Sequence, residues 1–114
     1  MKEATQILAL PEQTALRDLR NELAAIAKVT AVIIFGSVAR GEAAEGSDLD
    51  VLVVIDRELS YTEETAAYDA VYRTNLKYDT NISLVVVDAA RWESPIWSKL
   101  PLYQVVQQEG VILQ

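Results

Sequence analysis

Apolar residues follow two different periods in the first third of this chain. Leucines recur three or four residues apart from Leu16 to Leu23, after Pro11, which predicts an amphipathic helix over residues 12–27. Residues 29–35, in contrast, form a nearly continuous apolar run of the kind found in a strand buried on both faces. The pattern therefore predicts a helix followed by a buried strand.

The rest of the chain continues this alternation. The pattern predicts a turn with a short helix over 36–41, a loop over 41–47, a strand over 48–55, a helix over 62–78, a strand over 82–87, a short helical stretch from Asp88 to Glu93, and a last helix over 102–108 that Gly110 ends. Either Ser60 or Thr62 can cap the long central helix. This order predicts an α/β (α+β) fold in which a small mixed sheet packs against helices.

Length and composition narrow the possible chemistry. The chain has 114 residues, 51% of them hydrophobic, without internal repeats or linkers, which predicts one domain over residues 1–114. The sequence contains no cysteine and no histidine, so thiolate metal sites and a histidine general base are excluded. Catalysis, if present, depends on carboxylates, hydroxyls, Lys, Arg, Tyr and bound metal.

Charge and hydropathy indicate where the protein acts. Seventeen acidic and ten basic residues give a net charge of −7, which argues against direct binding to nucleic acid. Residues 1–6 are too polar for a signal peptide, and the apolar run over 82–87 is far shorter than the roughly 20 residues that span a bilayer. We therefore expect a cytoplasmic protein that does not bind membranes.

The residues with the most informative chemistry lie between the first two predicted strands. Gly36 lets backbone N–H groups approach a phosphate closely, and Ser37 and Arg40 add further donors. Asp48 and Asp50 are two residues apart on a strand, so their carboxylates project from one face. Because a cation relieves their repulsion, the spacing predicts a Mg²⁺ or Mn²⁺ site beside a phosphate-binding turn. Taken separately, the Gly36-Ser37 turn can be explained as a helix cap, and the two aspartates as polar residues at a strand edge that aid solubility.

This segment resembles the minimal nucleotidyltransferases of the DNA polymerase β superfamily. The resemblance rests on Gly36-Ser37, ten intervening residues and Asp48-Leu49-Asp50, with matching neighbours at 39–41 and Ser47 and a similar C-terminal run over 102–113. It implies a nucleotidyltransferase fold that transfers a nucleoside monophosphate from ATP or another NTP to a hydroxyl group. Carried over to this chain, it assigns nucleotide binding to Gly36, Ser37, Arg40 and Ser47, and catalysis and metal binding to Asp48 and Asp50.

The resemblance also implies a partner. Many similar small proteins are antitoxins encoded beside a HEPN-type RNase toxin, which some of them AMPylate on tyrosine. We therefore expect a HEPN-type toxin as the partner and a homo- or hetero-oligomeric assembly. The small size of the chain, its two tryptophans and its apolar last helix favour the same expectation.

One position departs from the family pattern. Active members carry a third carboxylate on the strand beside the Asp-x-Asp strand, and the matching position here is Ser83. Serine is no general base at neutral pH and binds Mg²⁺ weakly. Asp79 and Asp88 flank that strand, and Asp88 is better explained as a helix N-cap. Two functions stay open: an enzyme that AMPylates its toxin, and a catalytically weakened antitoxin or binding module that acts by complex formation.

Overall fold

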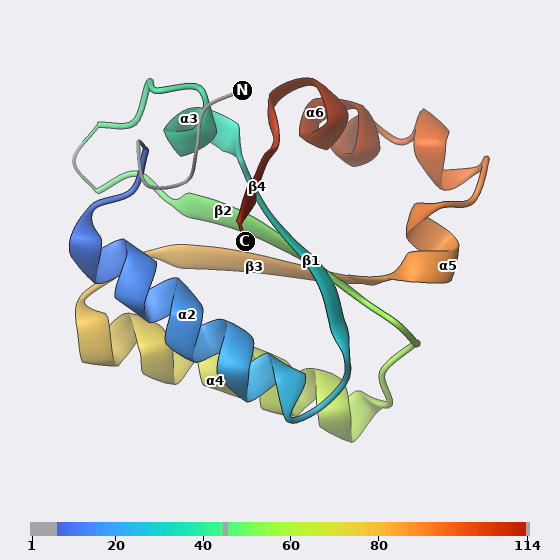
Figure 1. The fold of residues 1–114 in the computed structure, drawn as a ribbon, viewed down its shortest axis with the longest axis horizontal. Coiled ribbons are helices and arrows are strands. Elements are labelled where there is room, and N and C mark those ends of the chain that lie inside the picture. The colour runs from blue at the N-terminus through green and yellow to red at the C-terminus, as the bar shows by residue number, and fades with distance from the viewer. Residues whose placement is uncertain (1–6, 45, 114) are drawn as a thin grey trace.

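A four-stranded mixed sheet with the order β3-β2-β1-β4 forms the centre of the molecule (Figure 1). β1 pairs antiparallel with both β2 and β4, whereas β2 and β3 are parallel. The computed structural model describes residues 7–44 and 46–113, so the polar residues 1–6 lie outside the described part. The strands are β1 (Val29–Phe35), β2 (Leu49–Ile55), β3 (Ile82–Asp88) and β4 (Val111–Leu113).

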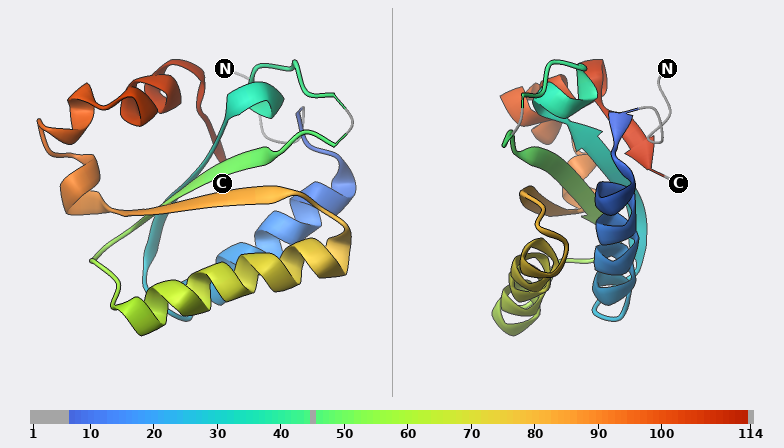
Figure 2. Two further views of the ribbon diagram at one scale, coloured as in Figure 1. Left: turned by 180° about the vertical axis from the view of Figure 1, so that it is seen from behind. Right: turned by 90° about the vertical axis from the view of Figure 1, so that its left-hand side faces the viewer.

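Helices cover both faces of this sheet, and two of them run side by side along one face (Figures 1 and 2). The helices are α2 (Leu10–Ala24), α3 (Gly36–Ala39), α4 (Tyr61–Tyr78), α5 (Ala89–Trp92) and α6 (Pro101–Glu109), with a 3-10 helix, η1 (Trp97–Lys99). The long helices α2 and α4 form the pair. Within the described residues, no helix has the length and apolar character needed to cross a bilayer.

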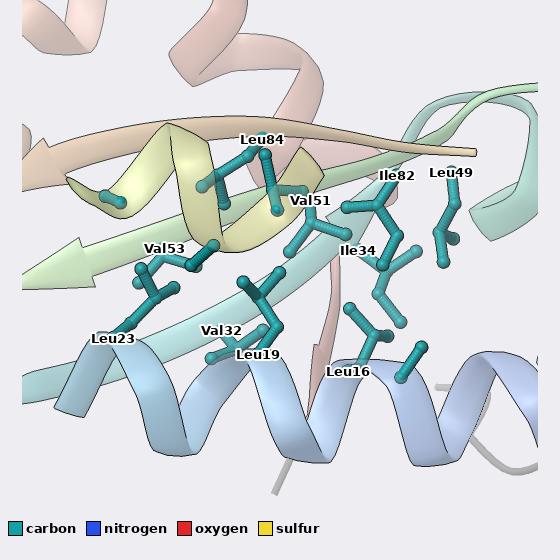
Figure 3. Close-up of a cluster of buried hydrophobic side chains, with 14 of the residues drawn as sticks. Leu16, Leu19, Leu23, Val32, Ile34, Leu49, Val51, Val53, Ile82 and Leu84 are labelled. Atoms are coloured by element: carbon teal, nitrogen blue, oxygen red, sulfur yellow. The ribbon is translucent and has the colours of Figure 1, made fainter. Parts of the chain in front are cut away.

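The larger core lies between the sheet and the helix pair α2/α4 (Figure 3). The leucines that predicted the first helix, from Leu16 to Leu23, point into this core and are at most 4% exposed. They meet alternate residues of the strands, such as Val51 and Val53 of β2, because side chains of a strand alternate between its two faces. Burying each such side chain contributes about 1.5–3 kcal/mol.

A smaller core lies on the opposite face of the sheet, under α5, η1 and α6. Leu52 and Val54 of β2 point to this face and pack with Trp92 of α5 and Val106 of α6. The ring centroids of Trp92 and Tyr103 are 4.7 Å apart at an interplanar angle of 46°. Asp50 is two residues before Leu52 and therefore belongs to this same face of the sheet.

The predicted fold class is confirmed, and most predicted elements are present. The strand over 29–35 is confirmed at both ends, and the strand over 82–87 extends one residue further, to Asp88. Ser60, not Thr62, caps α4, since its hydroxyl accepts a hydrogen bond from the Glu63 N–H at 3.2 Å.

Three features of the prediction were wrong. The first helix runs over Leu10–Ala24 instead of 12–27. It ends there because the N–H groups of Ala25 and Ile26 donate to the carbonyls of Glu22 and Leu23, only three residues earlier. The second strand begins at Leu49, so Asp48 precedes it. β4 was not predicted at all, because three residues after Gly110 carry too little pattern to indicate a strand.

Candidate active site

The turn after β1 and the start of β2 meet because these strands are antiparallel, with Phe35 opposite Asp50. Gly36 follows directly and is buried, with a φ of +78°. A Cβ atom at Gly36 would lie 2.2 Å from Oδ2 of Asp50. Glycine is therefore required here both by the backbone conformation and by the close approach of the carboxylate.

Asp48 and Asp50 place two negative charges beside this turn. Asp48 is exposed, whereas Asp50 is half-buried on the strand. Burial raises the pKa of Asp50, and the charges of Asp48 and Glu109 raise it further, while Arg40 lowers it. A hard divalent cation takes oxygen ligands of this kind, so the two carboxylates are suitable ligands for Mg²⁺ or Mn²⁺.

Asn81, which the sequence did not single out, orients Asp48. Its side-chain amide donates to Asp48 Oδ1 at 2.6 Å and to the Gly46 carbonyl at 3.3 Å. The backbone carbonyl of Asn81 accepts a hydrogen bond from the Leu49 N–H at 2.8 Å. Because β3 is parallel to β2, the residue before β3 lies beside the residue before β2, and only this pairing could have indicated Asn81.

Ser83 lies directly beside Asp50 in the register of the parallel pair and is exposed. The two acidic residues near β3 are elsewhere: Asp79 ends α4 in a left-handed conformation, and Asp88 caps α5 by accepting from the Arg91 N–H at 2.9 Å. Across residues 7–44 and 46–113, no group of three or more acidic side chains is arranged to hold a metal ion. Asp48 and Asp50 are therefore the carboxylates at the start of β2, and Ser83 adds a hydroxyl beside Asp50.

The remaining predicted nucleotide ligands have intramolecular contacts. Ser37 is half-buried in the first turn of α3. Ser47 accepts a hydrogen bond from the Ala44 N–H at 3.0 Å and closes the loop before β2. Arg40 donates to Glu42 and to Glu109, each at 2.9 Å. Ser37 therefore lies next to Gly36, whereas Arg40 and Ser47 support the surrounding backbone and loop in this conformation.

A family comparison identifies the domain. The family model described as a nucleotidyltransferase domain matches residues 16–109. The chain belongs to this nucleotidyltransferase family. The matched span contains the Gly36 turn, both aspartates, α4 and all of α6. Proteins of the family generally use a divalent metal and a nucleoside triphosphate.

Individual relatives agree with this family. The chain is 30% identical over 105 residues to "Putative protein adenylyltransferase MJ0604" of Methanocaldococcus jannaschii, an alignment that covers 90% of this chain and 97% of the relative. The alignment therefore extends over nearly the full length of that relative.

Solved structures share the fold. A toxin–antitoxin complex with AMP-PNP matches with a TM-score of 0.65 at 23% identity, covering 93% of this chain and 73% of that one. A tri-AMPylated Shewanella oneidensis HEPN toxin in complex with MNT antitoxin matches with a TM-score of 0.59 at 23% identity, covering 92% and 70%. The resemblance to minimal nucleotidyltransferases and the predicted nucleotidyltransferase fold are confirmed.

Proposed function

We propose that this nucleotidyltransferase is an antitoxin that binds ATP with Mg²⁺ or Mn²⁺ and transfers AMP to a hydroxyl group of a HEPN-type toxin. The observation that carries the proposal is the contact between the Gly36 turn and the Asp50 carboxylate, with Asp48 beside it. A site for metal and nucleotide needs phosphate donors and carboxylates side by side, and this contact supports such an arrangement.

Each residue has a distinct role in this proposal. Asp48 and Asp50 would hold the cation, which supplies positive charge against the triphosphate. The Ser37 hydroxyl and backbone N–H, next to the Gly36 turn, would donate to phosphate oxygens. Asn81 keeps the Asp48 carboxylate oriented through its 2.6 Å hydrogen bond.

The transfer itself is a displacement at phosphorus. The acceptor hydroxyl oxygen forms a bond to the α-phosphorus, the bond from that phosphorus to the bridging oxygen of the β-phosphate breaks, and pyrophosphate leaves. The hydroxyl proton passes to solvent, since Ser83 beside Asp50 offers no base at neutral pH.

Two comparisons support the acceptor and the partner. The relative from Methanocaldococcus jannaschii is named as a protein adenylyltransferase, and a structural neighbour is an MNT antitoxin in complex with a tri-AMPylated HEPN toxin. A protein hydroxyl is therefore the favoured acceptor, and a heteromeric complex with the toxin is the favoured assembly.

A second function is favoured by Ser83. In this alternative the chain binds ATP and the toxin but transfers AMP slowly or not at all, and neutralises the toxin by forming the complex. Its supporting observation is that Ser83 stands beside Asp50, where the family pattern has a carboxylate. Binding requires the turn and one cation, whereas rapid transfer also requires activation of the acceptor oxygen.

One experiment separates these functions. The chain is co-expressed with a HEPN-type toxin, taken from the neighbouring gene where that gene encodes one, and the purified complex is incubated with ATP labelled on the α-phosphate and MgCl₂. Transfer of label to the toxin, lost in Asp50→Asn, supports the enzyme. Toxin neutralised in a stable complex without label supports the second function. Absence of both complex and label would contradict both.

A further inference from the structure

Glu109, the last residue of α6, makes contacts that the proposed transfer does not use. Its Oε1 accepts a hydrogen bond from the Gly36 N–H at 2.9 Å. Nη1 of Arg40 donates to Oε1 at 2.9 Å and to Oε2 at 3.1 Å. The side chain of Glu109 is only 19% exposed, whereas that of Glu42, the other acidic partner of Arg40, is 66% exposed. Glu109 is therefore the inner acceptor shared by the turn and the guanidinium.

The sheet fixes this carboxylate in place. β4 pairs antiparallel with β1, with Ile34 opposite Val111. Extended by two residues, this register brings Glu109 opposite Gly36. α6 packs against β1, because its Val106 lies with Ile33 in the smaller core. The position of Glu109 is thus determined by β4 on one side and by α6 on the other.

We propose that Glu109 is a positioning residue that sets the conformation of the Gly36 turn and the direction of Arg40 for nucleotide binding. With the Gly36 N–H held by Glu109, the phosphate is left to the donors of Ser37. Within the described residues Arg40 forms no ion pair with Asp50, and its Nη1 instead donates to both oxygens of Glu109. Without this partner, Arg40 would pair with Asp50 and compete with the cation for that carboxylate.

The geometry also defines an opposite possibility, in which Glu109 is an anion that occupies the place of a phosphate and must leave before ATP binds. The two roles predict opposite signs for a variant without the carboxylate. A positioning residue strengthens nucleotide binding, so its removal weakens binding. A competing anion weakens nucleotide binding, so its removal strengthens binding.

The test measures the affinity for MgATP by calorimetry in three variants. Glu109→Ala removes both acceptors and should weaken binding roughly tenfold or more, the range expected for lost hydrogen bonds to a charged group. Glu109→Gln keeps an acceptor for the Gly36 N–H and should bind with intermediate affinity. Unchanged or tighter binding in Glu109→Ala would overturn the proposal.

Glu22→Ala is the matched control. Glu22 lies in the last turn of α2 and pairs with Arg73 of α4 at 2.9 Å, so it is also a helix-end glutamate that bridges to an arginine, away from the Gly36 turn. Its loss should change the melting temperature without changing the affinity for MgATP. An equal loss of affinity in this control would show that general destabilisation explains the effect, against a positioning role.

The positioning role rests on the proposed function, because that function supplies its ligand, MgATP. A second measurement therefore distinguishes a failure of the positioning role from a failure of the proposed function. Hydrogen exchange of the Gly36 amide, followed by NMR without nucleotide, should be at least about tenfold faster in Glu109→Ala than in wild type and partly restored in Glu109→Gln. If wild type does not bind MgATP, the proposed function fails, and this exchange pattern still supports the positioning of the turn. Equal exchange in all three proteins would overturn it.

Discussion

The two ends of the β2/β3 pair carry acidic residues in opposite electrostatic situations. The near end is the one with Asp48 and Asp50, and the far end is the one with Glu58, Glu63 and Asp88. At the far end, Glu63 pairs with Arg57, and Glu58 and Asp88 both pair with Arg91. At the near end, within the described part of the chain, no lysine or arginine forms an ion pair with the side chain of Asp48 or Asp50. The difference appears in the pKa values: Arg57 and then Ser60 lower the pKa of Glu63 to about 2, while burial raises the pKa of Asp50.

This comparison separates acidic residues that support the fold from those available to a ligand. A carboxylate with an arginine partner and a helix N-terminus to cap has its charge already balanced. Two neighbouring carboxylates without such partners leave a net negative field, which a cation can balance. The near end nevertheless has an arginine close by, Arg40, and Glu109 holds it. The charge available to a cation therefore depends on how Arg40 is directed.

Removal of both near-end aspartates should have the largest effect. In Asp48→Asn/Asp50→Asn, the affinity for MgATP should fall roughly a hundredfold or more, because both carboxylates that would balance the cation are lost. Calorimetry measures this, and Glu58→Gln/Asp88→Asn at the far end is the matched double control. Equal affinity of the wild type and the near-end variant would remove the distinction between the two ends.

Adding a carboxylate to the near end should change the rate. Ser83→Asp places a third acidic residue beside Asp50, and a base at this position increases transfer roughly a hundredfold. The measurement is the initial rate of label transfer from ATP to the toxin in the purified complex, with Ser83→Asn as the control of similar size. If wild type labels the toxin rapidly and Ser83→Asp does not increase the rate, Ser83 is not the position of a missing base.

The sequence predicted most of the fold because its apolar periodicity is strong. Leu16 and its neighbours indicated α2, and the apolar run over 29–35 indicated β1, since both patterns are local. β4 was missed because three residues contain no period, and its pairing with β1 is a long-range contact. The length of an element decides how visible it is in the sequence.

The candidate site was only partly visible for a related reason. Gly36, Asp48 and Asp50 lie within fifteen residues and form one motif, so their proximity could be predicted. Asn81 and Glu109 reach the same site from the start of β3 and the end of α6. Their contribution depends on the parallel register of β2/β3 and on the unpredicted β4, neither of which the motif contains.

A methyl group at Gly36 should perturb the near end more moderately. Gly36→Ala would place Cβ 2.2 Å from Asp50 Oδ2 and strain a backbone with φ +78°, so we expect a loss of about 1–3 kcal/mol in stability and roughly tenfold weaker MgATP binding. Gly46→Ala is the matched control, because its φ is +83° but, its two chain neighbours aside, no heavy atom of the described residues lies within 4 Å of the added Cβ. Thermal unfolding and calorimetry measure both. Similar losses of affinity in the two variants would show that backbone strain, and not the contact with Asp50, is responsible.

The smallest effect is expected at the far end, where the hydrogen-bonded pair of Glu63 and Arg57 is exposed and stabilises only the start of α4. The hydrogen bond from Arg57, at 2.9 Å, and that from the Ser60 N–H, at 3.0 Å, lower the pKa of Glu63 to about 2 from its usual value near 4.5. A carboxylate with a lowered pKa in the folded state stabilises the fold above its unfolded pKa and loses this contribution as the pH falls through the folded value. Glu63→Gln should therefore melt slightly below wild type at pH 7 and approach it as the pH falls from 4.5 towards 2. Melting curves at several pH values measure this difference, with Glu64→Gln, the next residue of α4, as the control. A difference that stays constant down to pH 2 would show that Glu63 acts through its shape and not its charge, and would weaken the contrast between the two ends of the sheet.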